Sequence, residues 1–143
     1  MAAGDAGDAM EMGEIDVIAG IGCRTGVAAW DIIAAVDGAL AAHALDRSRL
    51  RSLAIVPRKS REPAIHEAAM ALGVAVDLPS TTALDDADRR TVTRSGISRE
   101  VSGYGSASEA AALAAAGPGG RLLGPRFVSG GVTCALAVAE ETR

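Results

Sequence analysis

This sequence has few aromatic residues and no excess of positive charge. Only Trp30, Tyr104 and Phe127 are aromatic, and 14 basic residues stand against 18 acidic ones. Four of the acidic residues lie within residues 1–14, which leaves 14 acidic against 14 basic residues in the remainder. A nucleic-acid-binding surface needs a positive field and often aromatic stacking platforms. The composition therefore argues against nucleic acid as a partner.

Long hydrophobic runs are also missing. The most apolar candidate helix, Val27 to Leu45, is interrupted by Asp31, Asp37 and His43, so it falls short of the roughly 20 apolar residues that span a bilayer. Residues 1–14 have neither the basic nor the apolar region of a secretory signal, and their acidic, Gly- and Ala-rich composition predicts a disordered tail. We expect a cytoplasmic protein without membrane contact, in which residues 15–143 form one domain.

Cysteine, histidine and lysine are few as well. Cys23 and Cys134 are far apart in sequence without a secretory context, so we expect no disulfide, and we expect Cys134 in the core. His43 and His66 lack ligand spacing to each other or to the cysteines, so we expect both at the surface and no metal site. No cofactor is indicated. Lys59 is the only lysine beside 13 arginines.

The hydrophobic pattern alternates short strands with helices. Apolar runs predict strands at residues 15–21, 53–56 and 74–78. Helical spacing of Trp30, Ile33, Val36 and Leu40 predicts a helix within residues 27–45. A second helix is predicted at residues 63–72, because Pro63 suits a first helical turn and Gly73 suits a C-terminal cap. Strands that alternate with helices in this way favour a parallel sheet with right-handed crossovers.

The C-terminal part of the sequence adds one more helix and a hairpin. Ser106 and Glu109 have the Ser-x-x-Glu capping-box spacing at the start of an alanine-rich helix that stops at Gly117. The polar segment 82–101 predicts a short helix and a loop. Residues 121–128 and 132–140 flank Ser129-Gly130-Gly131, which is typical of a β-hairpin. The predicted fold is a single-domain, three-layer α/β fold with a mostly parallel sheet and a C-terminal β-hairpin.

The glycine-rich segment Gly20-Ile21-Gly22-Cys23-Arg24-Thr25-Gly26 follows the first predicted strand. Glycines at a strand-to-helix turn allow a ligand close to the backbone, and a helix N-terminus there favours an anion; the alternative is a tight turn that binds nothing. The spacing is one residue longer than the dinucleotide fingerprint, and no Gly-Lys-Ser/Thr is present, so NAD binding and a P-loop are both disfavoured. Cys23 beside Arg24 is either a nucleophile with a lowered pKa or, more in keeping with its setting, a small packed side chain.

Two further segments fall where ligands bind in open α/β sheets, beyond the carboxyl ends of the parallel strands. One is Val56-Pro57-Arg58-Lys59-Ser60-Arg61-Glu62-Pro63, whose cations suit a polycarboxylate, although a solvated loop is the commoner meaning of such a run. The other is Gly103-Tyr104-Gly105-Ser106, a possible anion nest that helix capping alone also explains.

Taken in order, GIGCRTG, RKSREPAI, GSASEAAALAAAG and LLGPRFVSGGVTCALA resemble the CobE family and the C-terminal domain of CbiG, proteins of cobalamin biosynthesis, from about Val17 to Glu140. The resemblance implies binding or handing on of a corrinoid intermediate, of the precorrin or hydrogenobyrinic acid type. The candidate contacts are Gly20, Gly22, Cys23, Arg24, Thr25, Arg58, Lys59, Gly105 and Ser106.

Two other functions stay open at this point. One is a hydrolase like the longer relatives, which open a lactone of a cobalt-precorrin and release acetaldehyde; Cys23, Glu62 or Glu109 would then assist proton transfer. The other is a docking module for neighbouring enzymes of the pathway.

Overall fold

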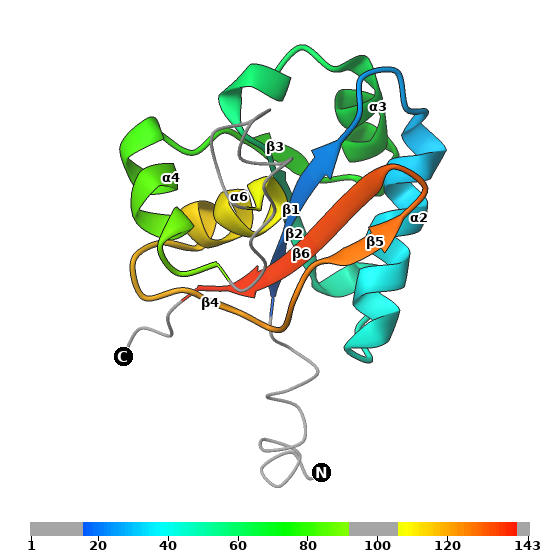
Figure 1. Ribbon diagram of the computed structural model, residues 1–143. Coiled ribbons are helices and arrows are strands. Elements are labelled where there is room, and N and C mark those ends of the chain that lie inside the picture. The colour runs from blue at the N-terminus through cyan, green and yellow to red at the C-terminus, as the bar shows by residue number, and fades with distance from the viewer. Residues whose placement is uncertain (1–15, 92–105, 140–143) are drawn as a thin grey trace, which may run out of the picture.

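The computed structural model describes residues 16–91 and 106–139, which form one sheet between two layers of helices (Figure 1). The strands of the sheet are β1 (Val17–Cys23), β2 (Leu50–Ala54), β3 (Ala75–Asp77), β4 (Arg121–Leu122), β5 (Phe127–Ser129) and β6 (Val132–Val138). The helices are α2 (Ala29–Ala42), α3 (Pro63–Leu72), α4 (Thr81–Asp88) and α6 (Ala107–Ala116), together with the short 3₁₀ turns η1 (Arg47–Arg49) and η2 (Pro57–Lys59). None of these helices is long and apolar enough to cross a membrane.

The strands have the order β3-β2-β1-β6-β4 across the sheet, and β5 also pairs with β6. Strand β1 pairs in parallel with β2, and β2 pairs in parallel with β3. Strand β6 runs antiparallel to β1, and both β4 and β5 run antiparallel to β6. Among the described strands, β6 alone therefore opposes the common direction, which confirms the predicted fold with a mostly parallel sheet and a C-terminal hairpin.

The two faces of the sheet bury different kinds of side chain. The face under α2 and α3 packs branched residues, including Ile21, Ile32 and Leu53. The opposite face packs alanines of α6 against alanines of β6 such as Ala135. Because alanine is small, α6 lies very close to β1: a Cβ added to Gly20 would lie 1.9 Å from the carbonyl oxygen of Ser108. Close approach of this helix requires glycine at that position of the strand.

Two helix boundaries follow their predicted signals. Helix α3 has Pro63 in its first turn and ends at Gly73, whose φ of 74° lies in the left-handed region that glycine tolerates. At the start of α6 the side-chain oxygen of Ser106 accepts a hydrogen bond from the backbone N–H of Glu109 at 3.4 Å. That bond satisfies one of the backbone donors that a helix start leaves free.

Several sequence-based boundaries were wrong. Strand β2 begins at Leu50, not at residue 53, because the exposed Arg51 interrupts the apolar pattern while the backbone still pairs with β1. The first arm of the hairpin is broken between β4 and β5 by Gly124-Pro125, since proline supplies no N–H to a ladder. Trp30 is 71% exposed and does not join the apolar face of α2. The segment at 82–101 forms α4 at its start; its later part and the N-terminal tail lie outside the described residues.

Candidate functional site

The glycine-rich segment is divided between a strand and a turn. Gly20 and Gly22 belong to β1, which ends at Cys23, and the turn that follows reaches α2 at Ala29. Gly26 in this turn has a φ of 89° and is exposed. Gly20 was expected to bring the backbone close to a ligand. In the structure the space beside Gly20 is occupied by α6, which gives another reason for a glycine at this position. The accessible part of the segment begins with the half-buried Gly22 and Cys23.

Three segments that are distant in sequence meet around this turn. The backbone N–H of Arg24 donates to the carbonyl oxygen of Gly131 in the β5–β6 turn at 3.2 Å. The backbone N–H of Gly26 donates to Oε2 of Glu62 at 3.2 Å, and Nζ of Lys59 donates to Oγ1 of Thr25 at 3.5 Å. The loop after β1, the segment after β2 and the hairpin turn thus form one surface at the carboxyl end of β1, which points upward in Figure 1.

The start of α6 lies at the same end of the sheet. A Cβ added to Gly22 would lie 3.7 Å from the backbone nitrogen of Ser108 and 2.7 Å from Oγ1 of Thr133. Ser106 is completely buried beside this point, and Gly105 lies outside the described residues. The buried Ser106 hydroxyl caps α6, so a ligand would approach this part of the surface through Gly22 and its neighbours.

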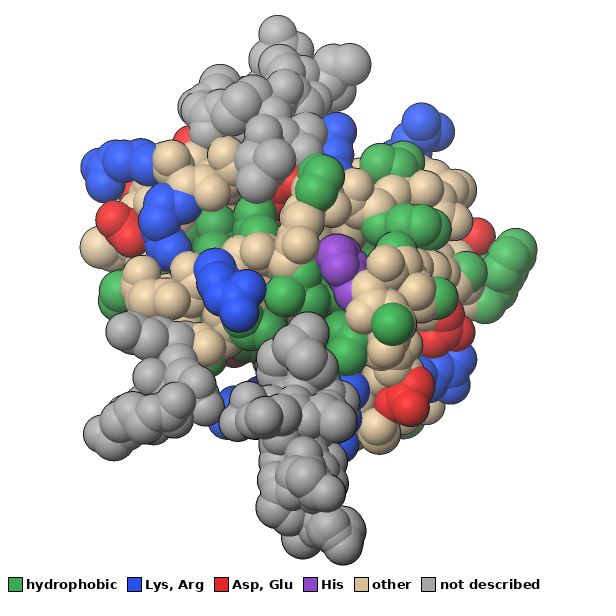
Figure 2. Space-filling model, turned by 90° about the horizontal axis from the view of Figure 1, so that it is seen from below, with side chains coloured by type: hydrophobic (Ala, Val, Ile, Leu, Met, Phe, Trp, Pro, Cys, Tyr) green, Lys and Arg blue, Asp and Glu red, His purple; other side chains and the backbone are tan. Residues whose placement is uncertain are grey.

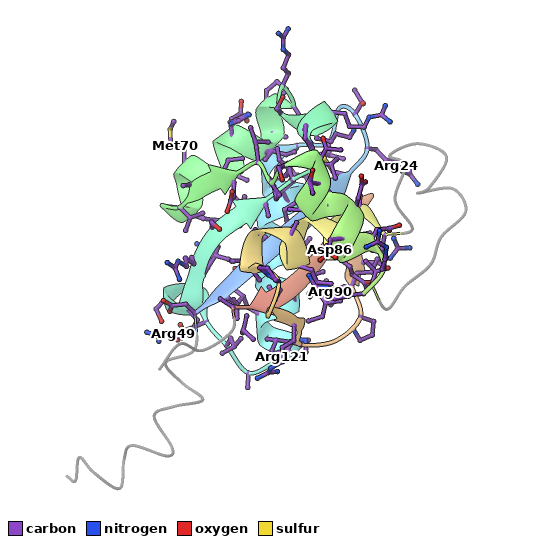
Figure 3. All side chains as sticks on the ribbon, turned by 90° about the vertical axis from the view of Figure 1, so that its left-hand side faces the viewer. Arg24, Arg49, Met70, Asp86, Arg90 and Arg121 are labelled. Carbon is purple, nitrogen blue, oxygen red and sulfur yellow. The ribbon has the colours of Figure 1, made fainter. Side chains whose placement is uncertain are left out.

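Cations surround the turn, and most of them have no acidic partner. Arg24, Arg58 and Arg61 are exposed, and within the described part of the chain none of their side chains forms an ion pair or a hydrogen bond. Lys59 is half-buried and contacts Thr25. Figure 3 labels Arg24 at this end of the molecule and Arg121 at the opposite end. We call Arg24, Arg58, Lys59 and Arg61 the cationic rim.

The Cys23 thiol does not have the lowered pKa expected of a nucleophile. Burial raises the pKa of Cys23 above its ordinary value of 9.0; the nearby Lys59 opposes this shift and Glu62 adds to it. The helix-terminus argument fails because α2 begins six residues later, at Ala29, so the thiol sits at a strand end against the apolar core. The reactive-cysteine hypothesis was wrong on this point, and the description of Cys23 as a packed side chain fits the structure.

Cys134, Glu109 and the two histidines lie outside the site around the glycine-rich turn. Burial raises the pKa of Cys134 to about 12, in agreement with its expected place in the core. His43 and His66 are exposed, as expected. Glu109 is fully buried, and its Oε2 accepts a hydrogen bond from the backbone N–H of Arg126 at 2.9 Å, which ties α6 to the β4–β5 connection. Over the ranges that the structure covers, no group of three potential ligands is placed to hold a metal ion.

A shallow hollow of about 700 Å³ opens between the starts of α2 and α3. Its walls are formed by the turn after β1, by Trp30 on α2 and by the residues around Pro63 on α3. The lining residues are Thr25, Gly26, Val27, Ala28, Ala29, Trp30, Arg61, Glu62, Pro63, Ala64 and Glu67. The sequence reasoning missed this hollow, because only the packing of α2 beside α3 brings their first turns together. It also missed the contact between the two turns. The Gly130-Gly131 turn was predicted, but the hydrogen bond from the Arg24 N–H to the carbonyl oxygen of Gly131 was not.

The other end of the sheet differs from this one. Figure 2 views the molecule from below, toward the amino ends of the parallel strands, and shows hydrophobic, charged and histidine side chains mixed over that surface. Arg121, at this end, is exposed on the short strand β4. It provides a natural comparison for the arginines of the cationic rim.

Comparison with known proteins agrees with the sequence motifs. The family model described as "Cobalamin synthesis G C-terminus" matches residues 17–137. The solved structure of CobE, a protein from the cobalamin (vitamin B12) biosynthetic pathway, is 32% identical over 90% of this chain and 94% of that chain, with a TM-score of 0.82. Cobalamin biosynthesis protein chiG from Agrobacterium tumefaciens str. C58 is 42% identical over 87% of this chain and 99% of that chain, with a TM-score of 0.70.

A more distant structure shares the fold alone. It is a homolog of cobalamin biosynthesis protein G from Sulfolobus solfataricus, 19% identical over 88% of this chain and 37% of that chain, with a TM-score of 0.63. A comparison with curated proteins gives no match. Because the family model spans most of the chain and two solved relatives exceed 30% identity over nearly their whole length, this protein belongs to the cobalamin biosynthesis family of CobE and the C-terminal domain of CbiG.

Proposed function

We propose that this protein binds a corrinoid intermediate of cobalamin biosynthesis at the carboxyl end of β1 and hands it on to the next step of the pathway. The observation that carries the proposal is the convergence of the glycine-rich turn, the segment after β2 and the hairpin turn, with the cationic rim around them. Membership of a cobalamin biosynthesis family supports a corrinoid as the class of ligand.

The charge of the rim suits the chemistry of such a ligand. Corrin precursors carry several acetate and propionate carboxylates around a partly conjugated macrocycle. Arginine donates paired hydrogen bonds that match the geometry of a carboxylate. Three arginines of the rim, Arg24, Arg58 and Arg61, have no competing acid among the described residues. Their charges are therefore available to a polycarboxylate without breaking an existing ion pair.

The hydrolase alternative has less support from the same site. The raised pKa of Cys23 keeps its thiol protonated at neutral pH, so the thiol is a poor nucleophile. Glu109 is buried and engaged with the backbone of Arg126. Glu62 remains, but its carboxylate already accepts the N–H of Gly26. Docking onto pathway enzymes without a bound corrinoid is a third possibility, and it predicts complexes that survive loss of the rim.

A titration tests the proposal. The purified protein is mixed with a metal-free corrinoid acid such as hydrogenobyrinic acid, and the visible spectrum of the pigment is followed. We expect a saturable spectral change. Arg24→Ala should raise the Kd about five- to tenfold, equivalent to roughly 1 to 1.4 kcal/mol. Arg121→Ala is the matched control, since it removes an exposed arginine from the opposite end of the sheet (Figure 3).

Two results would count against corrinoid binding at this site. An unchanged spectrum at high protein concentration would overturn the proposal as a whole. Equal weakening by Arg24→Ala and Arg121→Ala would leave only a general charge effect, and would reject the cationic rim as the binding surface. Release of acetaldehyde from a lactone-bearing precorrin would instead favour the hydrolase.

A further inference from the structure

Trp30 is an unusual surface residue. It is the single tryptophan of the chain, it lies in the first turn of α2, and 71% of it is exposed. Indole is largely apolar, and large exposed apolar groups beside a concave surface are typical of binding sites. The first turn of α2 needs no tryptophan for its own stability, because Ile32 and Val36 bury the helix in the core. A function at the surface would account for this side chain.

Trp30 forms one wall of the hollow between α2 and α3. Pro63 and Ala64 of α3 also line this hollow, so much of its lining is apolar. Its volume of about 700 Å³ falls within the range of small-molecule sites, roughly 300–1,000 Å³. Helices α2 and α3 lie side by side at this end of the molecule (Figure 1). The hollow is thus a ready place for a flat, apolar group of limited size.

The hollow is continuous with the proposed corrinoid surface. Thr25 and Gly26 line the hollow. Thr25 also accepts a hydrogen bond from Lys59, and the backbone N–H of Gly26 donates to Glu62. Arg61 belongs to both the cationic rim and the lining of the hollow. A ligand whose carboxylates bind the rim can therefore place its apolar part in the hollow without crossing any other segment.

We propose that Trp30 is the platform on which the conjugated ring of the bound corrinoid stacks, while the carboxylates at the edge of the ring reach Arg61 and the rest of the rim. This inference rests on the proposed function and adds that the site selects a conjugated macrocycle over flexible polycarboxylates. Indole offers a rigid, flat surface, and stacking on it does not depend on hydrogen-bonding groups of the ring.

Acidic side chains near the hollow give the inference a second consequence. Glu62 is held by the N–H of Gly26, whereas Glu67 lines the hollow one turn further along α3 and has no ion-pair partner among the described residues. A carboxylate-bearing ring on Trp30 would face the charge of Glu67 across the hollow. Glu67→Gln should therefore tighten corrinoid binding about two- to threefold, because it removes a like charge.

The test uses two signals on the whole protein. Hydrogenobyrinic acid is titrated while the visible spectrum of the pigment and the fluorescence of Trp30 are recorded, with free N-acetyltryptophanamide as the correction for absorbed light. We expect both signals to saturate together. Because energy transfer can quench a tryptophan at a distance, affinity decides the matter: Trp30→Ala should raise the Kd about tenfold, and Trp30→Phe should recover part of the loss.

Matched controls separate stacking from unspecific effects. Met70→Ala removes another exposed apolar side chain, 83% exposed on α3 but outside the hollow, and should leave the Kd unchanged. A flexible tetracarboxylate such as butane-1,2,3,4-tetracarboxylate, used as a competitor, should bind native protein and Trp30→Ala equally. A saturable spectral change with the same Kd in Trp30→Ala would overturn the inference and leave the proposed function standing. The absence of any spectral change would overturn both.

Discussion

Replacement of Gly20 by alanine is the sharpest test of how this fold is held together. The added Cβ would lie 1.9 Å from the carbonyl oxygen of Ser108 and 2.7 Å from the backbone nitrogen of Ala112. Both atoms belong to the backbone of α6, so no side-chain rotation relieves the contact. To reach 3.0 Å, below which Cβ contacts essentially do not occur, α6 must retreat from β1 by roughly 1 Å.

The expected loss of stability follows from that displacement. Overpacking a core typically costs about 1–3 kcal/mol, and a backbone contact belongs at the upper end of this range. Replacing glycine by alanine within a strand returns about 0.5–1 kcal/mol. We therefore expect Gly20→Ala to lower the free energy of unfolding by about 2–2.5 kcal/mol, a large part of the 5–15 kcal/mol of an ordinary domain.

Gly22→Ala is the matched control for this substitution. Gly22 lies two residues later on the same face of β1, but its added Cβ would meet a side-chain atom, Oγ1 of Thr133, at 2.7 Å. Rotation of Thr133 relieves this contact at the cost of its 3.4 Å hydrogen bond to the carbonyl oxygen of Gly22. We expect a change within about 1 kcal/mol, because the contact is relieved locally while the strand gains a side chain. Urea denaturation followed by far-UV circular dichroism measures both variants. Equal stability of the two variants would refute the claim that α6 requires glycine at position 20.

Two further predictions concern the same end of the sheet. The raised pKa of Cys23 means that alkylation by iodoacetamide should be slow at pH 7.5 and should rise only toward pH 9 and above, as measured by mass spectrometry of the labelled peptide; a rate that levels off below pH 8 would contradict the raised pKa. Ser106→Ala removes the cap of α6 and should cost about 1 kcal/mol in thermal or urea unfolding. Ser106→Thr keeps a hydroxyl acceptor without adding a charge at this buried position, and should lose less; equal losses would show that the cap bond is not the cause.

The sequence was sufficient for the elements whose signals are local. A proline in the first turn and a glycine after the last one set the limits of α3, and the Ser-x-x-Glu spacing marked the start of α6. These signals work because they satisfy or terminate backbone hydrogen bonds within a few residues. Alternation of strands and helices then indicated the layers, and the ordered motifs indicated the family.

The position of Trp30 could not be predicted from its own segment. Its spacing from Ile33 and Val36 placed it with the apolar residues of the helix, yet α2 buries Ile32, Ala35, Val36, Ala39 and Leu40 and leaves Trp30 71% exposed. Apolar residues occur on more than one side of this helix, so hydrophobic periodicity alone did not show which side the core covers. The break in the hairpin, by contrast, has a local signal, since Gly124-Pro125 is a turn dipeptide that the strand predicted across residues 121–128 overlooked.

The glycine-rich turn illustrates the division between sequence and structure most clearly. Its composition alone determined that three of its seven backbone positions carry no side chain and that one cation, Arg24, lies within it. Tertiary packing decided what each glycine is for: Gly20 admits α6, and Gly26 adopts a positive φ beside Glu62. It also decided the ionisation of Cys23, because the pKa of a thiol depends on burial and on charges brought close by other segments. Local hydrogen bonding can be inferred from neighbouring residues, whereas burial and long-range contact arise only when the whole chain is folded.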